Sequence, residues 1–315
     1  MRALSIDAWG GLPVVRDVPE PPPAAGRAFV RVLRASINPV DLAIGAGRFY
    51  MPLPDPPFTP GAEVVGEVIA SDAHPAGTRV WCLPITGGLA EVVSAPEESL
   101  VPVPEDVPDG LAVALGIAGL AGWMPVLDRG ALVPGETVVV LGASGVVGQV
   151  AVQAARSAGA ARIVAVARSA TGRDRAIARG ADVALATGPD LAAALREACP
   201  EGADLVIDPL WGDSALAAIG VLRRRGRLVQ VGNAEGPAVA MAAGPLRGGL
   251  LDIRGFSVLV EDHERVRSAY SEICAAALAG EVALDIDEVS LDGAPAAWQR
   301  QASGAGGRKA VVAIA

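Results

Sequence analysis

Hydrophobic positions change their spacing along the 315 residues of this chain. Up to about residue 110, short apolar runs such as AFVRVLRASI and EVVGEVIA are broken by Pro and Gly, which is typical of an all-β region. The Ala-rich run from Asp109 to Leu127 lacks alternation and predicts helices. Strand-like and helix-like segments then alternate, which favours a doubly wound parallel sheet. Its strands are expected at Thr137–Leu141, Arg162–Ala167, Leu205–Ile207 and Leu228–Val231.

The pattern changes again after about Ser257. Residues 261–280 are amphipathic with helical spacing, and two strand-like runs follow, ALDIDEVSL and KAVVAIA. We expect the closing strand to return to the first region. The sequence therefore predicts an α/β protein with a discontinuous β-rich domain over residues 1–113 and 257–315 and a parallel-sheet domain over residues 114–256.

Three glycines, Gly142, Gly145 and Gly148, follow the strand at Thr137–Leu141 and precede a helix expected from Val147 to Ser157. A pyrophosphate binds against backbone N–H groups at the start of such a helix, and a Cβ at these turns would block its approach. The alternative is an ordinary turn in a chain with 38 glycines. The placement between strand and helix favours dinucleotide binding. The residues expected to contact the cofactor in this turn are Gly142, Ala143, Ser144, Gly145, Val146, Val147 and Gly148.

The carboxyl ends of the later strands carry further candidates, because ligands bind at that edge of a parallel sheet. This reasoning nominates residues 208–211 and 232–234, with Gly232 and Asn233 as cofactor contacts. Asn233 is expected to lie near the nicotinamide. The alternative is that Asn233 is only a turn residue before Gly236.

The end of the second strand indicates which dinucleotide binds. Folds that prefer NAD carry an acidic residue there, whereas this chain has Ala167, followed by Arg168, Ser169 and Arg173. Two guanidinium groups and a hydroxyl suit a 2′-phosphate, so the sequence predicts NADPH. The alternative is that both arginines are solvated surface charge.

Composition limits the classes of binding partner and the cellular compartment that we expect. The net charge of −9 argues against a nucleic-acid or anionic-membrane surface. Three cysteines lie far apart, which indicates neither a disulfide framework nor a cysteine zinc site and favours a cytoplasmic protein. The N-terminus has no long apolar run after a basic start, and we expect no apolar stretch of about 18 residues, hence no signal peptide or membrane span.

Several spaced motifs occur in order along nearly the whole chain. They are INPVD (37–41), PGAEVVGEV (60–68), GTRVW (77–81), GGLAEVV (87–93), GASGVVG (142–148), VGNAEG (231–236) and GRKAVV near the C-terminus. Together they resemble the medium-chain dehydrogenase/reductase superfamily, in its zinc-independent quinone oxidoreductase and enoyl reductase branch. The resemblance implies a GroES-like β-rich catalytic domain, formed by both chain ends, and a central Rossmann domain. It also implies a homodimer that pairs through an extended sheet, for which we expect Leu250–Val260 to form the contact.

Zinc-dependent members of that superfamily carry a Cys where this chain has Asn38 and a His where it has Ala62. The chain contains only two histidines, His74 and His263, and lacks the cysteine-rich structural zinc lobe. We therefore expect no metal site, since a catalytic Zn²⁺ needs three protein ligands.

The INPVD motif supplies the first catalytic candidates. Asn38 is expected to contact substrate or nicotinamide, and Asp41 and Tyr50 complete the candidate set. The alternative for Asn38 and Asp41 is that they cap a short helix beginning at Pro39, which is favoured for Asp41. Glu63 is either an acid at the floor of a cleft or, as favoured, a structural carboxylate.

The resemblance implies an NADPH-dependent, metal-independent oxidoreductase that transfers hydride to an activated C=C bond or a quinone in a small, hydrophobic, carbonyl-bearing substrate. Quinone oxidoreductases usually place a Tyr and an Arg where this chain has Ala43 and Gly45, so an enone or enoyl acceptor is at least as well supported. The alternatives are a nucleotide-binding scaffold or sensor without turnover, and a non-redox cyclase or lyase.

Overall fold

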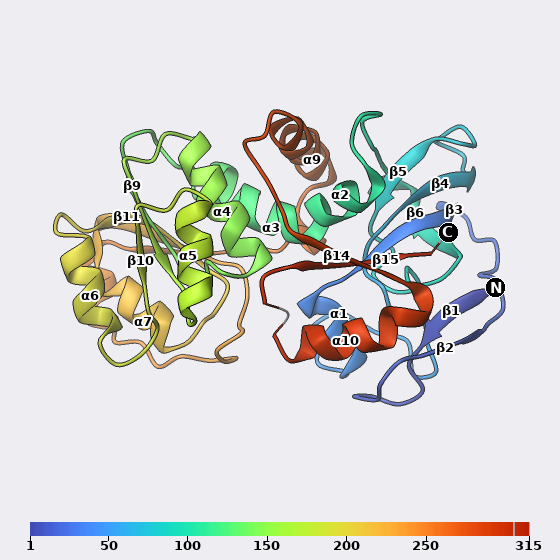
Figure 1. The fold of residues 1–315 in the computed structure, drawn as a ribbon, viewed down its shortest axis with the longest axis horizontal. Helices are drawn as coiled ribbons and strands as arrows, with labels where there is room; N and C mark the ends of the chain where they lie inside the picture. The colour runs from blue at the N-terminus through green and yellow to red at the C-terminus, as the bar shows by residue number, and fades with distance from the viewer. Residues whose placement is uncertain (305, 315) are drawn as a thin grey trace. The chain divides into compact units, whose positions relative to one another are not determined.

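The computed structural model describes residues 1–304 and 306–314 of the chain (Figure 1). The chain divides into two compact units. The first contains Met1–Ile117, Asp262–Leu278 and the chain from Leu284 onward, and the second contains Ala118–Glu261 with Ala279–Ala283. The first boundary falls inside a helical run that continues beyond the predicted end of the β-rich domain at residue 113.

The first unit is built on a seven-stranded sheet in the order β14-β15-β3-β4-β5-β7, with β6 paired to β3, and a separate two-stranded sheet. Its strands are β1 (Arg2–Ser5), β2 (Val14–Asp17), β3 (Arg27–Ile37), β4 (Val64–Ala70), β5 (Arg79–Cys82), β6 (Val92–Pro96), β7 (Val101–Pro102), β14 (Ile286–Ser290) and β15 (Lys309–Ala313). Its α-helices are α1 (Pro39–Gly45), α2 (Asp109–Ala114), α9 (His263–Leu278) and α10 (Ala294–Ala302).

Strand β3 shows why this region reads as all-β. Ala28, Val30 and Val32 are fully buried and alternate with more exposed residues, because one face of the strand covers the core. The strand ends in a fully enclosed stretch from Ala35 to Ile37, where β4 and β15 pair with it on either side. The expected return of the closing strand to the first region is confirmed by the antiparallel pairing of β15 with β3.

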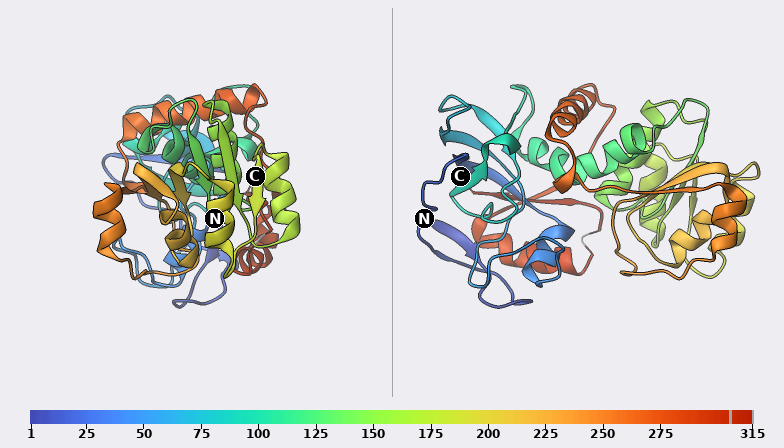
Figure 2. Two further views of the ribbon diagram at one scale, coloured as in Figure 1. Left: turned by 90° about the vertical axis from the view of Figure 1, so that its left-hand side faces the viewer. Right: turned by 180° about the vertical axis from the view of Figure 1, so that it is seen from behind.

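The second unit is a six-stranded, entirely parallel sheet in the order β10-β9-β8-β11-β12-β13, with helices on both faces (Figure 2). This is the predicted doubly wound sheet. Its strands are β8 (Thr137–Val140), β9 (Arg162–Val166), β10 (Val183–Leu185), β11 (Ala203–Asp208), β12 (Leu222–Gln230) and β13 (Asp252–Gly255). Its α-helices are α3 (Leu120–Met124), α4 (Val146–Ser157), α5 (Ala170–Ala178), α6 (Leu191–Ala198), α7 (Asp213–Ile219) and α8 (Ala243–Gly249).

One sequence expectation about apolar segments is wrong. The helical run Asp109–Arg129, with a mean hydropathy of 1.8 over 18 residues, is long and apolar enough to cross a membrane. Its many small residues, alanine and glycine, make this apolar character easy to overlook in the sequence. Because 78% of that window is buried, the run has the burial of a core helix in a folded protein.

Strand β12 begins earlier than expected. The sequence predicts a strand at Leu228–Val231, but the strand starts at Leu222 and includes three consecutive arginines. Arg223 pairs with the buried carboxylate of Asp204, and Arg227 is buried against Glu136, with Nη1 and Nη2 at 3.0 and 2.6 Å from its carboxylate oxygens. A hydropathy pattern does not identify such a strand, because two of its arginines are paired with acidic residues elsewhere in the chain.

Candidate functional site

The glycine turn of the second unit is tightly packed on itself. Gly142 has φ of +58°, a backbone conformation that favours glycine. A Cβ at Gly148 would lie 2.4 Å from the carbonyl oxygen of Gly142 and 2.6 Å from Cα of Ala143. A Cβ at Gly145 would meet only the same carbonyl, at 3.4 Å. Gly148 is therefore required by packing, whereas Gly145 leaves open space at the start of α4.

The turn fits an anionic ligand. Gly145 is the N-cap of α4, a 12-residue helix, and makes no side-chain capping bond. The N–H groups of the first helical turn have no partner within the helix and point along the positive end of its dipole. The open space at Gly145 lies at these donors, so the predicted segment Gly142–Gly148 has the geometry to receive a pyrophosphate.

Two other loops contact this turn. The side chains of Pro209 and Leu210, which follow β11, come within 3.1 and 3.2 Å of the Cβ position of Gly142. A Cβ at Gly172, near the start of α5, would lie 2.7 Å from Cβ of Ser144. The structure thus brings together the loops after β8, β9 and β11.

The residues after β9 divide into different roles. Arg168 is exposed, and Ala167 is buried at the strand end. Ser169 is the N-cap of α5 and accepts a hydrogen bond from N–H of Gly172 at 3.0 Å. Arg173 donates through Nη1 to the carbonyl of Arg168 at 3.1 Å. Arg173 therefore braces the loop, and Arg168 is the more accessible of the two predicted phosphate ligands.

The loop after β12 is fixed against the loop after β11. A Cβ at Gly232 would lie 2.9 Å from the carbonyl oxygen of Pro209, so glycine is needed there. The carbonyl of Asn233 accepts a hydrogen bond from N–H of Gly236 at 3.1 Å, which is the turn role weighed in the sequence. Contact of Asn233 with a nicotinamide stays a prediction.

Asp208, at the end of β11, is nominated by the sequence only as part of a range. Its Oδ1 accepts N–H bonds from Leu210 at 2.8 Å and Trp211 at 3.0 Å, which holds the loop, and Trp211 adopts φ of +49°. Its Oδ2 is buried without a partner. Burial raises the pKa of this carboxyl above its ordinary value.

In the first unit, a buried polar cluster surrounds Asn38 and Asp41. Oδ2 of Asp41 accepts N–H of Asn38 at 2.7 Å and Oδ1 accepts N–H of Ala62 at 2.8 Å. Burial raises the pKa of Asp41 to about 6, although those two N–H bonds and the nearby Lys309 oppose the shift. Asp41 is fully buried, and its two bonds fix the start of α1 and the chain before β4.

Asn38 is 1% exposed and its side-chain amide is engaged inside the protein. Nδ2 donates to Oγ of Ser36 at 3.0 Å and to Oε1 of Glu63 at 2.9 Å, and Oδ1 accepts from Nζ of Lys309. These bonds fix the amide orientation. The geometry supports a structural role for Asn38, and its contact with substrate stays a prediction.

Lys309 is not among the residues expected from the sequence. It starts β15, where the pairing of Ala310 with Ile37 places it beside Asn38, and its Nζ lies 3.4 Å from Oε1 of Glu63. Burial lowers the pKa of Lys309, while Glu63 and Asp41 oppose that shift. One feature of the sequence could have indicated a particular role for Lys309: it is the only lysine in a chain whose 25 other basic residues, counting Lys and Arg, are all arginines.

Tyr50 lies in the loop after α1 and is 67% exposed, with its ring 4.5 Å from that of Phe49. Asn38 and Asp41, by contrast, are buried. Trp123 is 6% exposed and is a core residue.

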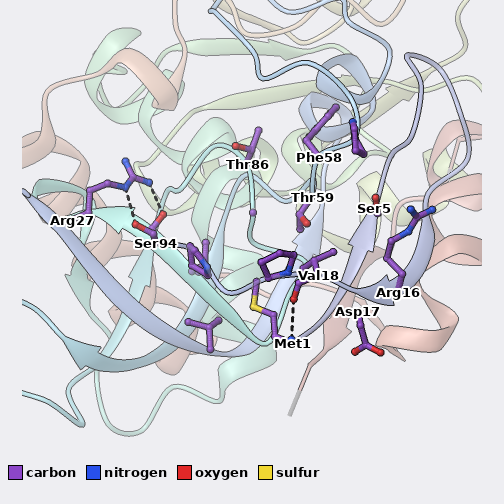
Figure 3. A pocket seen from close by; sticks show the side chains of 16 residues that line it. Met1, Ser5, Arg16, Asp17, Val18, Arg27, Phe58, Thr59, Thr86 and Ser94 are labelled. Carbon is purple, nitrogen blue, oxygen red and sulfur yellow. Dashed lines mark hydrogen bonds between the residues drawn. The ribbon is translucent and has the colours of Figure 1, made fainter. Parts of the chain in front are cut away.

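A hollow of about 520 Å³ lies elsewhere on the first unit (Figure 3). Among its lining residues, Arg27 donates to Ser94, and the N-terminal ammonium donates to the carbonyl of Val18. It contains none of the predicted site residues. Among residues 1–304 and 306–314, no group of three or more His, Cys, Asp or Glu side chains could hold a metal ion.

Two alanine substitutions separate packing from binding in the glycine turn. We expect Gly148→Ala to lower the free energy of unfolding by about 1 to 3 kcal/mol, because its Cβ meets rigid backbone. Gly145→Ala should change stability by less than about 1 kcal/mol but weaken dinucleotide binding about tenfold, by filling the open space. Denaturant unfolding measures the stability of both variants, and titration with NADPH measures their affinity for the dinucleotide. A Gly148→Ala protein with the stability and NADPH affinity of the parent would contradict the packing role of Gly148.

Asp41 predicts a pH dependence of stability. Its folded pKa of about 6 exceeds the ordinary 3.8, so between these values the folded state holds a proton that the unfolded state has lost. Stability should fall as pH rises through this window, by on the order of 2 to 3 kcal/mol. Asp41→Asn removes this contribution, so its unfolding free energy should decline less from pH 4 to 6. Urea unfolding at several pH values measures both proteins. If the unfolding free energies of the parent and of Asp41→Asn depend on pH identically between pH 4 and 6, the raised pKa of Asp41 is contradicted.

Comparisons with known proteins agree with the geometry. An alcohol dehydrogenase GroES-like domain matches residues 24–105, and a zinc-binding dehydrogenase domain matches residues 146–273. Quinone oxidoreductase of Mus musculus is 30% identical over 248 residues, covering 74% of this chain and 73% of that protein. Prostaglandin reductase-3 of Bos taurus is 30% identical over 249 residues, and this match covers 75% of the chain and 63% of that relative.

Solved structures show the same fold over the whole chain. The quinone oxidoreductase of Thermus thermophilus, also solved as its complex with NADPH, is 30% identical with a TM-score of 0.83 and full coverage of both chains. That of Pseudomonas syringae pv. Tomato has a TM-score of 0.91 at 23% identity, covering 99% of each chain. The chain belongs to the medium-chain dehydrogenase/reductase superfamily of oxidoreductases, in its quinone oxidoreductase-like branch.

Proposed function

We propose that this protein is an NADPH-dependent, metal-independent reductase that transfers hydride to an activated C=C bond or a quinone. The observation that carries the proposal is the loop after β9, which contacts the glycine turn, carries Ala167 where NAD-binding folds carry an acid, and exposes Arg168 and Ser169 directly after it. The NADPH complex of the Thermus thermophilus relative supports the same cofactor.

The chain's own residues would hold and orient the cofactor. N–H groups of the first turn of α4 would bind the pyrophosphate, and Arg168 would bind the 2′-phosphate through charge-assisted hydrogen bonds. Arg173 would keep Arg168 in place by bonding its carbonyl. A bound nicotinamide supplies the hydride.

The acceptor is proposed to be small, hydrophobic and carbonyl-bearing, with an enone or enoyl compound favoured over a simple quinone. The position where quinone oxidoreductases usually carry an Arg is Gly45, which lies beneath Trp298 and Ile6: a Cβ there would be 2.8 and 2.9 Å from their side chains. A side chain at this position would require Trp298 and Ile6 to shift. Tyr50, in the loop after α1, is exposed and is proposed as the donor to the oxyanion that develops on the substrate.

We also propose a homodimer that pairs through β13. This strand is an edge of the six-stranded sheet, and an edge strand presents backbone N–H and C=O groups that can pair with a second copy. Ile253 and Val260 are exposed, but Phe256 and Val258, which were expected to contribute, are buried within the protomer. The contact is therefore narrower than the predicted Leu250–Val260. A cytoplasmic location is proposed on three free, buried cysteines.

The function is tested by following NADPH absorbance with enones, enoyl thioesters and quinones. We expect oxidation with at least one acceptor, and a preference for NADPH over NADH on the order of 100-fold. Arg168→Ala should remove most of this preference and Ala167→Asp should reverse part of it, with Arg175→Ala on α5 as a matched control. Tight NADPH binding without oxidation of any acceptor would favour the scaffold alternative, and equal affinity for both cofactors would refute the phosphate assignment.

The dimer is tested by light scattering at micromolar concentration. We expect twice the mass of the 315-residue chain, and a shift toward monomer in Ile253→Asp, because a charge opposes pairing of the edge strand. Ile177→Asp, at an exposed apolar position on α5, is the control. A monomeric parent protein contradicts the proposal.

A further inference from the structure

The helical run Asp109–Arg129 is interrupted at Gly116. Gly116 has φ of −62° and ψ of −119°, and the ψ value is not helical. In an uninterrupted helix, N–H of Ile117 would bond the carbonyl four residues earlier, and the carbonyl of Ala112 would accept N–H of Gly116. An interruption in a buried helix leaves such groups in need of other partners.

Side chains from distant segments take up these groups. N–H of Ile117 donates to Oε2 of Glu63 at 2.6 Å, and the carbonyl of Ala112 accepts the hydroxyl of Tyr270 at 2.9 Å. Trp81 links Glu63 to Tyr270, since its Nε1 donates to the same Oε2 at 2.9 Å and its ring stacks on Tyr270 with centroids 4.8 Å apart.

The interruption requires glycine. A Cβ at Gly116 would lie 2.1 Å from Oε2 of Glu63 and 2.2 Å from Nε1 of Trp81. Gly116, the carboxylate of Glu63 and the indole of Trp81 fit together closely. The interruption of the helix is therefore a specific feature of the packing in the first unit.

The other oxygen of Glu63 serves the cluster around Asn38. Oε1 accepts from Oγ of Ser36, from Nδ2 of Asn38 and from Nζ of Lys309. Both oxygens thus receive only donors, and a carboxylate is the side-chain group that accepts at both. In a glutamine at this position, the side-chain N–H₂ would replace one of the two oxygens. Its hydrogens would then face at least two other donors, with no acceptor between them.

We propose that Glu63 is a positioning residue for the reductase reaction, acting through Asn38, the predicted contact to substrate or nicotinamide, because its one carboxylate fixes both the amide of Asn38 and the broken turn at Gly116 and Ile117. Lys309 is the counter-charge that makes this arrangement possible in a fully buried setting. The inference rests on the proposed function, since it concerns the rate of that reaction.

The test compares Glu63→Gln with Glu67→Gln, a matched control on the solvent side of β4 whose carboxylate pairs with Arg31. In Glu63→Gln we expect kcat to fall on the order of tenfold or more, because small misplacements are costly in catalysis. The NADPH dissociation constant should stay within about twofold, since the glycine turn lies in the other unit. Hydrogen exchange of the Ile117 amide, followed by NMR, should accelerate by more than about tenfold.

Parental kcat in a folded Glu63→Gln protein overturns the inference, whatever its thermal stability. If that variant does not fold, Trp81→Phe decides, because it removes one N–H donor from Oε2 of Glu63 and keeps an aromatic ring against Tyr270. A decrease in kcat with unchanged NADPH affinity and faster Ile117 exchange supports the proposal, and unchanged kcat overturns it. Failure of the proposed function is distinguishable, because the unsubstituted protein would then fail to oxidise NADPH with any of the acceptors tested. The inference about Glu63 would fall with it.

Discussion

The buried carboxylate of Glu63 is the interaction on which the polar interior of the first unit depends. It is fully buried, and burial of a carboxylate is tolerable only with a counter-charge and hydrogen-bond donors at both oxygens. Lys309 provides the charge, and Ser36, Asn38, Trp81 and Ile117 provide the remaining donors. Such pairs contribute little net stability, but they specify a single arrangement, because removal of one partner leaves the other uncompensated.

The topology of the sheet follows from the same requirement. β15 must pair with β3 for the ammonium of Lys309 to reach Asn38, and this pairing brings the end of the chain back to its beginning. An ammonium is compact and can reach one carboxylate and one amide oxygen, whereas a guanidinium presents five donors in a fixed plane. The use of lysine here, and arginine everywhere else, is consistent with that geometry.

The second unit is governed by close approach of backbone segments. Gly148 and Gly232 each place backbone where a Cβ would collide with a carbonyl oxygen. The contact at Gly148 closes the loop after β8 on itself, and the contact at Gly232 joins the loops after β11 and β12; the side chains of Pro209 and Leu210 join these two loops to Gly142 in the loop after β8. The loop after β9 joins them through Ser144 and Gly172, so the residues that would hold the two ends of a dinucleotide belong to one packed group.

The sequence by itself determined the elements whose causes are local. Buried β-branched runs predicted β8, β9 and β11, the glycine spacing predicted the turn, and α4 ends at Ser157 as expected. The ordered motifs determined the family. Only the tertiary structure decided the roles of polar residues: Glu63 and Lys309 are 246 residues apart, and Asn38 is held by both. Local patterns carry no information on such pairings, because the free energy of a buried charge depends on donors and counter-charges that the fold brings from elsewhere in the chain.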